Sequence, residues 1–151
     1  MPWCGHAKAE NVSVAGNMLT GPEVVADTLS TWVEAADLPF AERLVAAMEA
    51  GERPGGDKRG KQAAGLMIYA GQPYPALDLR VDDHDDPLAE LRRLMAVTEE
   101  RYLLFREAMG TVENFSGMVD RTPLDIAIAE NEAKRAAKGI VSQSRATPLT
   151  S

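Results

Sequence analysis

The chain has 151 residues and a mass of 16.3 kDa, the size of one ordinary domain. Apolar residues make up 45% and charged residues 26%, a balance typical of a globular protein that excludes a disordered tail. The net charge of −7 argues against non-specific binding to nucleic acid or an anionic membrane, because both need a basic face. No apolar run approaches the roughly 20 residues that span a bilayer, and no signal peptide is readable, so a cytoplasmic location is expected. The single cysteine excludes an internal disulfide and a cysteine-based zinc cluster.

The first fifty residues predict one strand followed by two helices. Residues 11–16 alternate in their middle and contain two valines, which favours a short strand. Proline and glutamate at 22–23, just after Thr20, are typical of a helix N-terminus, and apolar residues then recur at helical spacing. A second helix carries its apolar face over 40–48, and Gly51 fits its C-terminal cap.

The middle of the chain predicts a loop and then a pair of strands. Residues 52–62 are polar and rich in glycine, which indicates a loop. The continuous apolar run 63–70 is typical of a strand covered on both faces. Residues 77–82 alternate between apolar and charged side chains, as a half-buried strand does. The short turn between the two runs predicts an antiparallel hairpin.

The last third predicts helices. Asp86 and Pro87 open a long periodic helix that ends at Gly110, since aspartate can cap a helix and proline is preset for its first turn. A weaker, alanine-rich helix follows over 122–138, and residues 140–151 have no periodicity. The expected class is mixed α/β (α+β), in the order β-α-α-β-β-α-α. Three strands are few for this many helices, so part of the layered domain is expected to come from elsewhere.

An acidic turn, Asp82-Asp83-His84-Asp85-Asp86, follows the last predicted strand. One interpretation is a divalent-metal or acid–base site; the other is a solvated turn that caps the next helix. Metal ligands must converge, whereas five consecutive side chains do not all point one way, so the turn is favoured and no metal is predicted. Asp82 and His84 remain candidate site residues.

Two further features could carry chemistry. The stretch 55–62 combines glycines with lysine and arginine, which could cradle an anion or be simply a flexible loop; it lacks the ending of a Walker loop. Asn17, between a strand and a helix start, could donate its amide to a developing oxyanion. Asparagine is also common in turns, and spacing alone favours that reading.

Four stretches taken together resemble one family. They are 3–6 (WCGH), 15–25 (AGNMLTGPEVV), 55–62 (GGDKRGKQ) and 78–84 (DLRVDDH) leading into 87–91 (PLAEL). In this order they are similar to the bacterial family called domain of unknown function 1028, placed among the Ntn-hydrolase-like proteins, over about residues 3 to 110. Cys4 stands where that family usually has alanine, and Ala63 where serine is frequent.

The resemblance implies that this chain is the C-terminal half of a four-layer αββα sandwich. Residues 1–110 would form that half, 111–139 a linker and a weak helix, and 140–151 a disordered tail. In such enzymes an N-terminal Thr, Ser or Cys attacks an amide carbonyl, with its own α-amine as base. The whole protein is therefore expected to be an amide-bond hydrolase acting on a small molecule without a cofactor, and this chain alone is expected to be inactive.

The resemblance also assigns candidate roles within the chain. Asn17 would be an oxyanion donor, and the residues expected to line the substrate site are Asp57, Arg59, Gln62, Arg80, Asp82 and His84. Arg80 and Asp82 have a simpler interpretation as a salt-bridged strand face. The alternative function is a non-catalytic binding or dimerisation module that associates through the helix 88–109 or an exposed sheet edge, and a homo-oligomer is expected.

Overall fold

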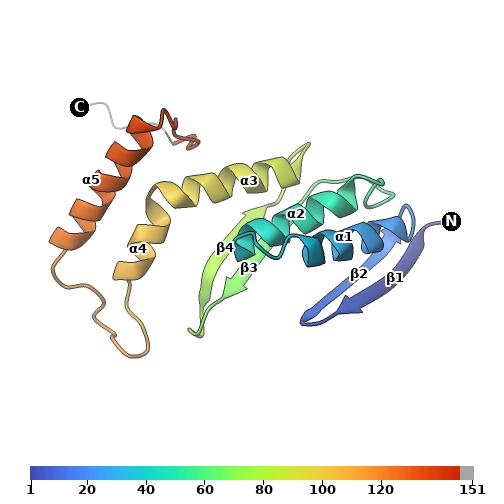
Figure 1. Ribbon diagram of the computed structural model, residues 1–151, viewed down its shortest axis with the longest axis horizontal. Coiled ribbons are helices and arrows are strands. Elements are labelled where there is room, and N and C mark those ends of the chain that lie inside the picture. The colour runs from blue at the N-terminus through green and yellow to red at the C-terminus, as the bar shows by residue number, and fades with distance from the viewer. Residues whose placement is uncertain (147–151) are drawn as a thin grey trace. The chain divides into compact units, whose positions relative to one another are not determined.

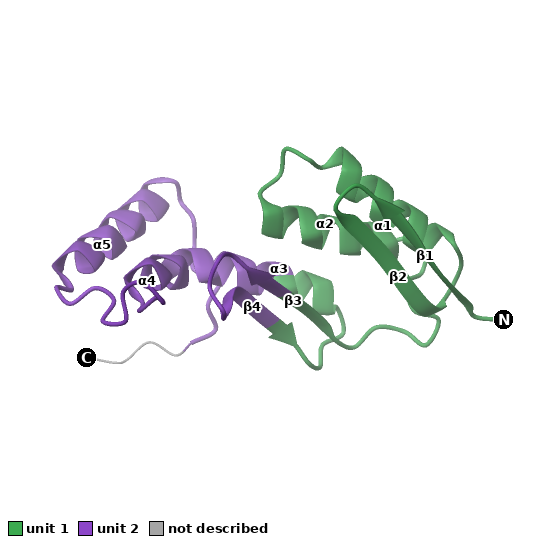
Figure 2. Cartoon of the chain, turned by 90° about the horizontal axis from the view of Figure 1, so that it is seen from below, with its two compact units in different colours: residues 1–66, 80–91 green, residues 67–79, 92–151 purple. Residues whose placement is uncertain are grey.

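The computed structural model describes residues 1–146 and shows a mixed α and β protein with two two-stranded sheets (Figure 1). The elements in chain order are β1 (Trp3–Ala9), β2 (Val12–Leu19), α1 (Glu23–Glu34), α2 (Phe40–Glu52), β3 (Ala64–Tyr69), β4 (Pro75–Val81), α3 (Pro87–Val97), the π-helical turn η1 (Thr98–Tyr102), α4 (Leu103–Ala108) and α5 (Thr122–Ala137). They form two compact units, the first made of residues 1–66 and 80–91 and the second of 67–79 and the chain from 92 onward (Figure 2). Within residues 1–146, no helix is both long enough and apolar enough to cross a membrane.

The first unit begins with an antiparallel hairpin that the sequence predicted only in part. β2 extends the expected strand, whereas β1 was not expected, because its sequence WCGHAKA has no β-branched residue. Side chains alternate along both strands between an exposed and a half-buried face. The half-buried face packs against α1. The small core between them consists of Trp3, Ala7, Val14, Leu19, Val24 and Val25.

The hairpin is irregular near its open end. Trp3 pairs with Leu19 and Gly5 with Gly16, so β2 contains one more residue than β1 between these pairs. This is a β-bulge. Met18 takes up the extra length with a φ of 60°, in the left-handed region that non-glycine residues rarely occupy.

Helices α1 and α2 form the predicted pair. The rings of Trp32 and Phe40 meet edge to face at 5.6 Å between centroids, and the Arg43 guanidinium lies 3.9 Å from the centre of the Trp32 ring. Gly51 is not the C-terminal cap that the sequence predicted, because α2 continues through Glu52. Gly51 is buried against Thr28 of α1, so its small size serves helix packing.

Strands β3 and β4 pair as predicted, but β3 is not covered on both faces. Leu66 is buried, while Met67 and Tyr69 are 52% and 60% exposed. An apolar run of residues does not by itself show that both faces of a strand are buried, because burial depends on which other elements pack against the strand. β4 shows the predicted alternation, with Leu77 and Val81 buried and its charged residues exposed.

The long helix expected over 87–109 is interrupted by η1 and resumes as α4. In a π turn the ladder of backbone hydrogen bonds shifts by one residue, which changes the partners of the local carbonyl groups. Asn131 of α5 donates its side-chain amide to the Glu99 and Glu100 carbonyl oxygens at 3.1 and 3.0 Å. The Glu100 carboxylate in turn accepts hydrogen bonds from the Ser142 hydroxyl and the Gln143 backbone N–H at 2.7 and 2.8 Å. Part of the segment after α5 is therefore attached to the π turn.

Candidate functional site

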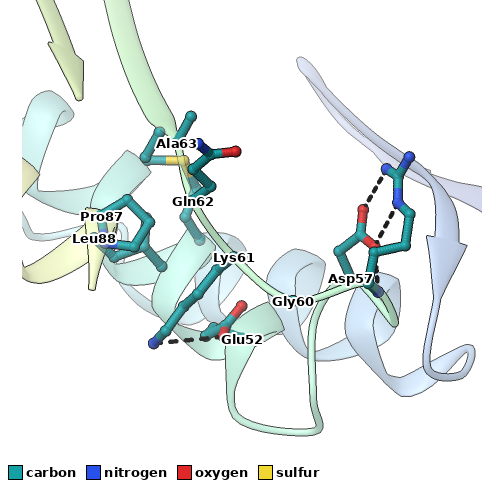
Figure 3. A pocket seen from close by; sticks show the side chains of 11 residues that line it. Glu52, Asp57, Gly60, Lys61, Gln62, Ala63, Pro87 and Leu88 are labelled. Carbon is teal, nitrogen blue, oxygen red and sulfur yellow. Dashed lines mark hydrogen bonds and ion pairs between the residues drawn. The ribbon is translucent and has the colours of Figure 1, made fainter. Parts of the chain in front are cut away.

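The first unit contains an open cavity of about 600 Å³ (Figure 3). Its walls come from the end of α2, the loop that leads into β3, the start of β3 and the start of α3. The lining residues are Met48, Glu52, Asp57, Arg59, Gly60, Lys61, Gln62, Ala63, Ala64, Pro87 and Leu88. The cavity thus combines apolar side chains with charged and amide groups, as ligand sites commonly do.

The loop in front of the cavity is held against the bulged end of β2. The Thr20 N–H donates to the Gly56 carbonyl oxygen at 3.0 Å, and the Lys58 N–H donates to the Met18 carbonyl oxygen at 2.7 Å. The loop reaches this position because Gly55 and Gly56 adopt φ values of 118° and 50°, which glycine tolerates without steric cost. The stretch 55–62 is therefore an ordered segment around which the cavity is built.

Asp57 and Arg59 form a bidentate pair at one end of the cavity (Figure 3). The Arg59 Nε and Nη2 atoms lie 3.0 and 2.7 Å from the two carboxylate oxygens, and the Arg59 backbone N–H donates to the same group at 2.8 Å. The side-chain hydrogen bonds first, and the backbone one next, lower the pKa of Asp57 to about 2. The carboxylate is consequently ionised throughout the physiological pH range.

Gln62 joins the cavity to the acidic turn. Its side-chain Nε2 donates to Asp83 Oδ1 at 3.0 Å, and its backbone carbonyl accepts from the His84 N–H at 3.0 Å. His84 is half-buried, and its Nδ1 accepts a hydrogen bond from the Asp86 N–H at 2.9 Å. The imidazole thus orders the acidic turn beside the cavity, and it is not among the residues that line it.

Lys61 lies between two carboxylates that sequence reasoning did not connect. Its Nζ is 3.6 Å from Glu52 Oε1 and 3.5 Å from Asp86 Oδ2. Asp86 also caps α3, since its Oδ1 accepts from the Ala89 N–H at 3.1 Å, which confirms the predicted cap. That backbone hydrogen bond, and then the Lys61 charge, lower the pKa of Asp86. Glu52 sits at a helix end with no motif around it, so no sequence signal marks it.

The remaining candidates lie outside this cavity. Arg80 and Asp82 form a 2.8 Å ion pair with side chains 70% and 75% exposed, which agrees with the simpler interpretation of a charged strand face. Asn17 is exposed on β2, and its Oδ1 accepts a hydrogen bond from the Met18 N–H at 2.8 Å. Asp57, Arg59 and Gln62 are therefore the sequence candidates that the structure brings together. For residues 1–146, no group of three or more His, Cys, Asp or Glu side chains is arranged to hold a metal ion.

Comparison with known proteins supports one family. The model of a family of unknown function (DUF1028) matches residues 1–91, which include every residue that lines the cavity. A crystal structure of a DUF1028 protein from Silicibacter pomeroyi is similar, with 26% sequence identity and a TM-score of 0.65 over 78% of this chain and 52% of that chain. This chain thus spans about half the length of that protein. No curated protein matches it significantly. Because the family model covers more than half of the residues, the chain belongs to the DUF1028 family.

Proposed function

We propose that this chain is the C-terminal portion of an Ntn-hydrolase-like fold and forms the substrate-binding wall of an amide hydrolase. The observation that carries the proposal is the cavity of about 600 Å³ on which the loop 57–62 and the start of α3 converge. Both segments belong to the stretches that resemble the family, although 24 residues lie between Gln62 and Pro87 in the sequence. The match to only 52% of the Silicibacter pomeroyi protein supports the view that a complete domain is longer.

The polar groups of the cavity suit an amide ligand. A carboxylate oxygen of Asp83 accepts the hydrogen bond, so the amide nitrogen of Gln62 faces Asp83. The Gln62 Oε1 is then left as an acceptor for a ligand N–H. The Arg59 guanidinium supplies donors for a carbonyl or carboxylate oxygen of the ligand.

The cavity offers binding groups and no hydroxyl or thiol nucleophile of the Ntn-hydrolase type. None of its lining residues carries a hydroxyl or a thiol. In the complete enzyme, a Ser, Thr or Cys from the remaining part of the fold would add to the amide carbonyl while its proton passes to the leaving nitrogen. The amine would then depart, and water would hydrolyse the acyl-enzyme to the acid.

Asn17 retains its proposed role as an oxyanion donor in the complete fold. Its Oδ1 is occupied by the Met18 N–H, so the Nδ2 group remains as the donor on the exposed face of β2. A carboxamide held by its oxygen has a defined donor direction, which is what stabilisation of a developing oxyanion requires.

The experiment is a titration of the ¹⁵N-labelled chain with N-acetylglycylglycinamide, a neutral molecule containing three amide groups. We expect shifts at the Gln62 side-chain amide and no hydrolysis. Gln62→Ala should weaken binding about fivefold, the equivalent of one neutral hydrogen bond. Lys58→Ala is the matched control, because Lys58 lies in the same loop and does not line the cavity. The proposal would be contradicted if the peptide did not bind, or if Gln62→Ala bound it as tightly as the unaltered chain. Hydrolysis of the peptide by this chain alone would contradict the statement that the nucleophile comes from the rest of the fold.

A non-catalytic module that forms homo-oligomers is the second candidate function. The observation that favours it is the exposure of large apolar side chains on β3, where Met67 and Tyr69 are 52% and 60% exposed. Apolar groups left in water in this way favour association. Sedimentation of the chain tests this: Met67→Lys with Tyr69→Lys should convert a dimer into a monomer, and a monomer in the unaltered chain would exclude the module.

A further inference from the structure

The two ends of the cavity rim differ in charge. At one end, the Arg59 side chain is 69% exposed. Of its five N–H groups, the Nε–H and one on Nη2 contact Asp57, which leaves three for another acceptor. A planar guanidinium of this kind binds a carboxylate through two parallel hydrogen bonds. Arg59 and Asp57 together carry no net charge, so this end of the rim offers an anionic group the remaining N–H donors of Arg59.

The other end carries an excess of negative charge. The Lys61 ammonium faces two carboxylates, Glu52 and Asp86, so the three groups together have a charge of −1. The distances of 3.6 and 3.5 Å are longer than the roughly 2.7–2.9 Å of a charge-assisted hydrogen bond. Asp86 also accepts from the backbone of α3, whereas the Glu52 carboxylate, at the cavity wall and 33% exposed, remains open to a second cation.

Part of the cavity lining is apolar. Met48, Ala63, Ala64 and Leu88 contribute uncharged side chains there. The volume of about 600 Å³ falls in the usual range for small-ligand sites, about 300–1,000 Å³.

We infer that the cavity binds a zwitterionic amide, such as a short unblocked peptide, with its carboxylate on Arg59 and its ammonium on Glu52. The inference rests on the proposed function and names its substrate class. It gives the two charged ends of the rim separate tasks, and Gln62 also lines the cavity, where its side chain can bind the amide.

The test compares four molecules that share the glycylglycine backbone and differ in whether each end is charged or blocked by a neutral acetyl or amide group. They are glycylglycine, N-acetylglycylglycine, glycylglycinamide and N-acetylglycylglycinamide. Titrated into the labelled chain at pH 7, the zwitterion should bind about fivefold more tightly than either singly charged form, since one exposed ionic contact contributes at most about this factor. The doubly blocked form should bind most weakly.

Two variants test which end of the cavity rim binds the carboxylate of the peptide and which binds its ammonium group. Arg59→Gln should remove the preference for a free carboxylate and keep that for a free ammonium, and Glu52→Gln should do the reverse. Arg53→Gln, in the turn after α2 and away from the cavity lining, is the control and should change neither preference. If the doubly blocked molecule binds at the cavity as tightly as glycylglycine, the zwitterion inference is overturned and the proposed function stands. If none of the four molecules shifts the cavity signals, both fail.

Discussion

Substituting Gly51 by alanine should destabilise the first unit, although alanine is the better helix former. Gly51 lies inside α2 at its contact with α1. A methyl group added there would overlap the Thr28 hydroxyl oxygen and would lie 3.1 Å from the Val24 carbonyl oxygen. The second of these contacts involves backbone, so the two helices would have to separate by a few tenths of an ångström.

The magnitude follows from opposing effects. Alanine gains up to about 1 kcal/mol of helix propensity over glycine. Overpacking costs about 1–3 kcal/mol, and turning Thr28 aside breaks its 2.7 Å hydrogen bond to the Val24 carbonyl, which costs about 1 kcal/mol more. We therefore expect Gly51→Ala to lower the free energy of unfolding of the first unit by about 1–3 kcal/mol.

The assay is urea unfolding followed by tryptophan fluorescence. Both tryptophans, Trp3 and Trp32, belong to the first unit, so their signal reports its unfolding without contribution from the second. Thr28→Ala removes the side chain that the new methyl group meets. In that background Gly51→Ala should cost less, by about 1 kcal/mol. An unchanged or raised stability in Gly51→Ala, or an equal loss in both backgrounds, would refute the packing argument.

Three further outcomes test other contacts. The pKa of Asp57 is about 2 in the folded protein against 3.8 for an unperturbed aspartate, so the stabilising effect of its ionised form should be complete above pH 4 and disappear between pH 4 and 2. An NMR titration of the Asp57 carboxyl checks this, and Arg59→Gln should return its titration midpoint towards 3.8. Arg43→Lys should lower the stability of the first unit by about 0.5–1 kcal/mol and shift the emission of Trp32, because lysine loses the planar stacking contact. Glu100→Ala should accelerate hydrogen exchange in the segment after α5 and leave the tryptophan unfolding curve unchanged.

Local signals predicted the elements that depend on neighbouring residues. The start of α3 is an example, since both the cap at Asp86 and the first-turn Pro87 act within a few residues. The alternation of β4 is another. β1 was missed because its strand conformation comes from pairing with β2 and not from its own composition.

The candidate site was predicted only in part. Asp57, Arg59 and Gln62 belong to one motif stretch, and the structure places all three at the cavity. Glu52 and Met48 carry no sequence signal, because their role depends on where the end of α2 lies relative to the loop. Arg80 and Asp82 belong to a motif stretch as well, yet Arg80 lies on the exposed face of β4 and pairs with Asp82 just after the strand, outside the cavity.

The sequence by itself determined the family, the types of most elements and the N-termini of the helices, because motif residues, caps and periodicity act over short stretches of chain. Only the tertiary structure decided that Lys61 would stand between Glu52 and Asp86, that Gly51 would serve helix packing, and that a π turn would interrupt the long helix. Each of these features is a contact or backbone change imposed by packing between segments that are distant in sequence. A local sequence pattern does not specify which side chains, distant in sequence, a residue will contact in the folded protein.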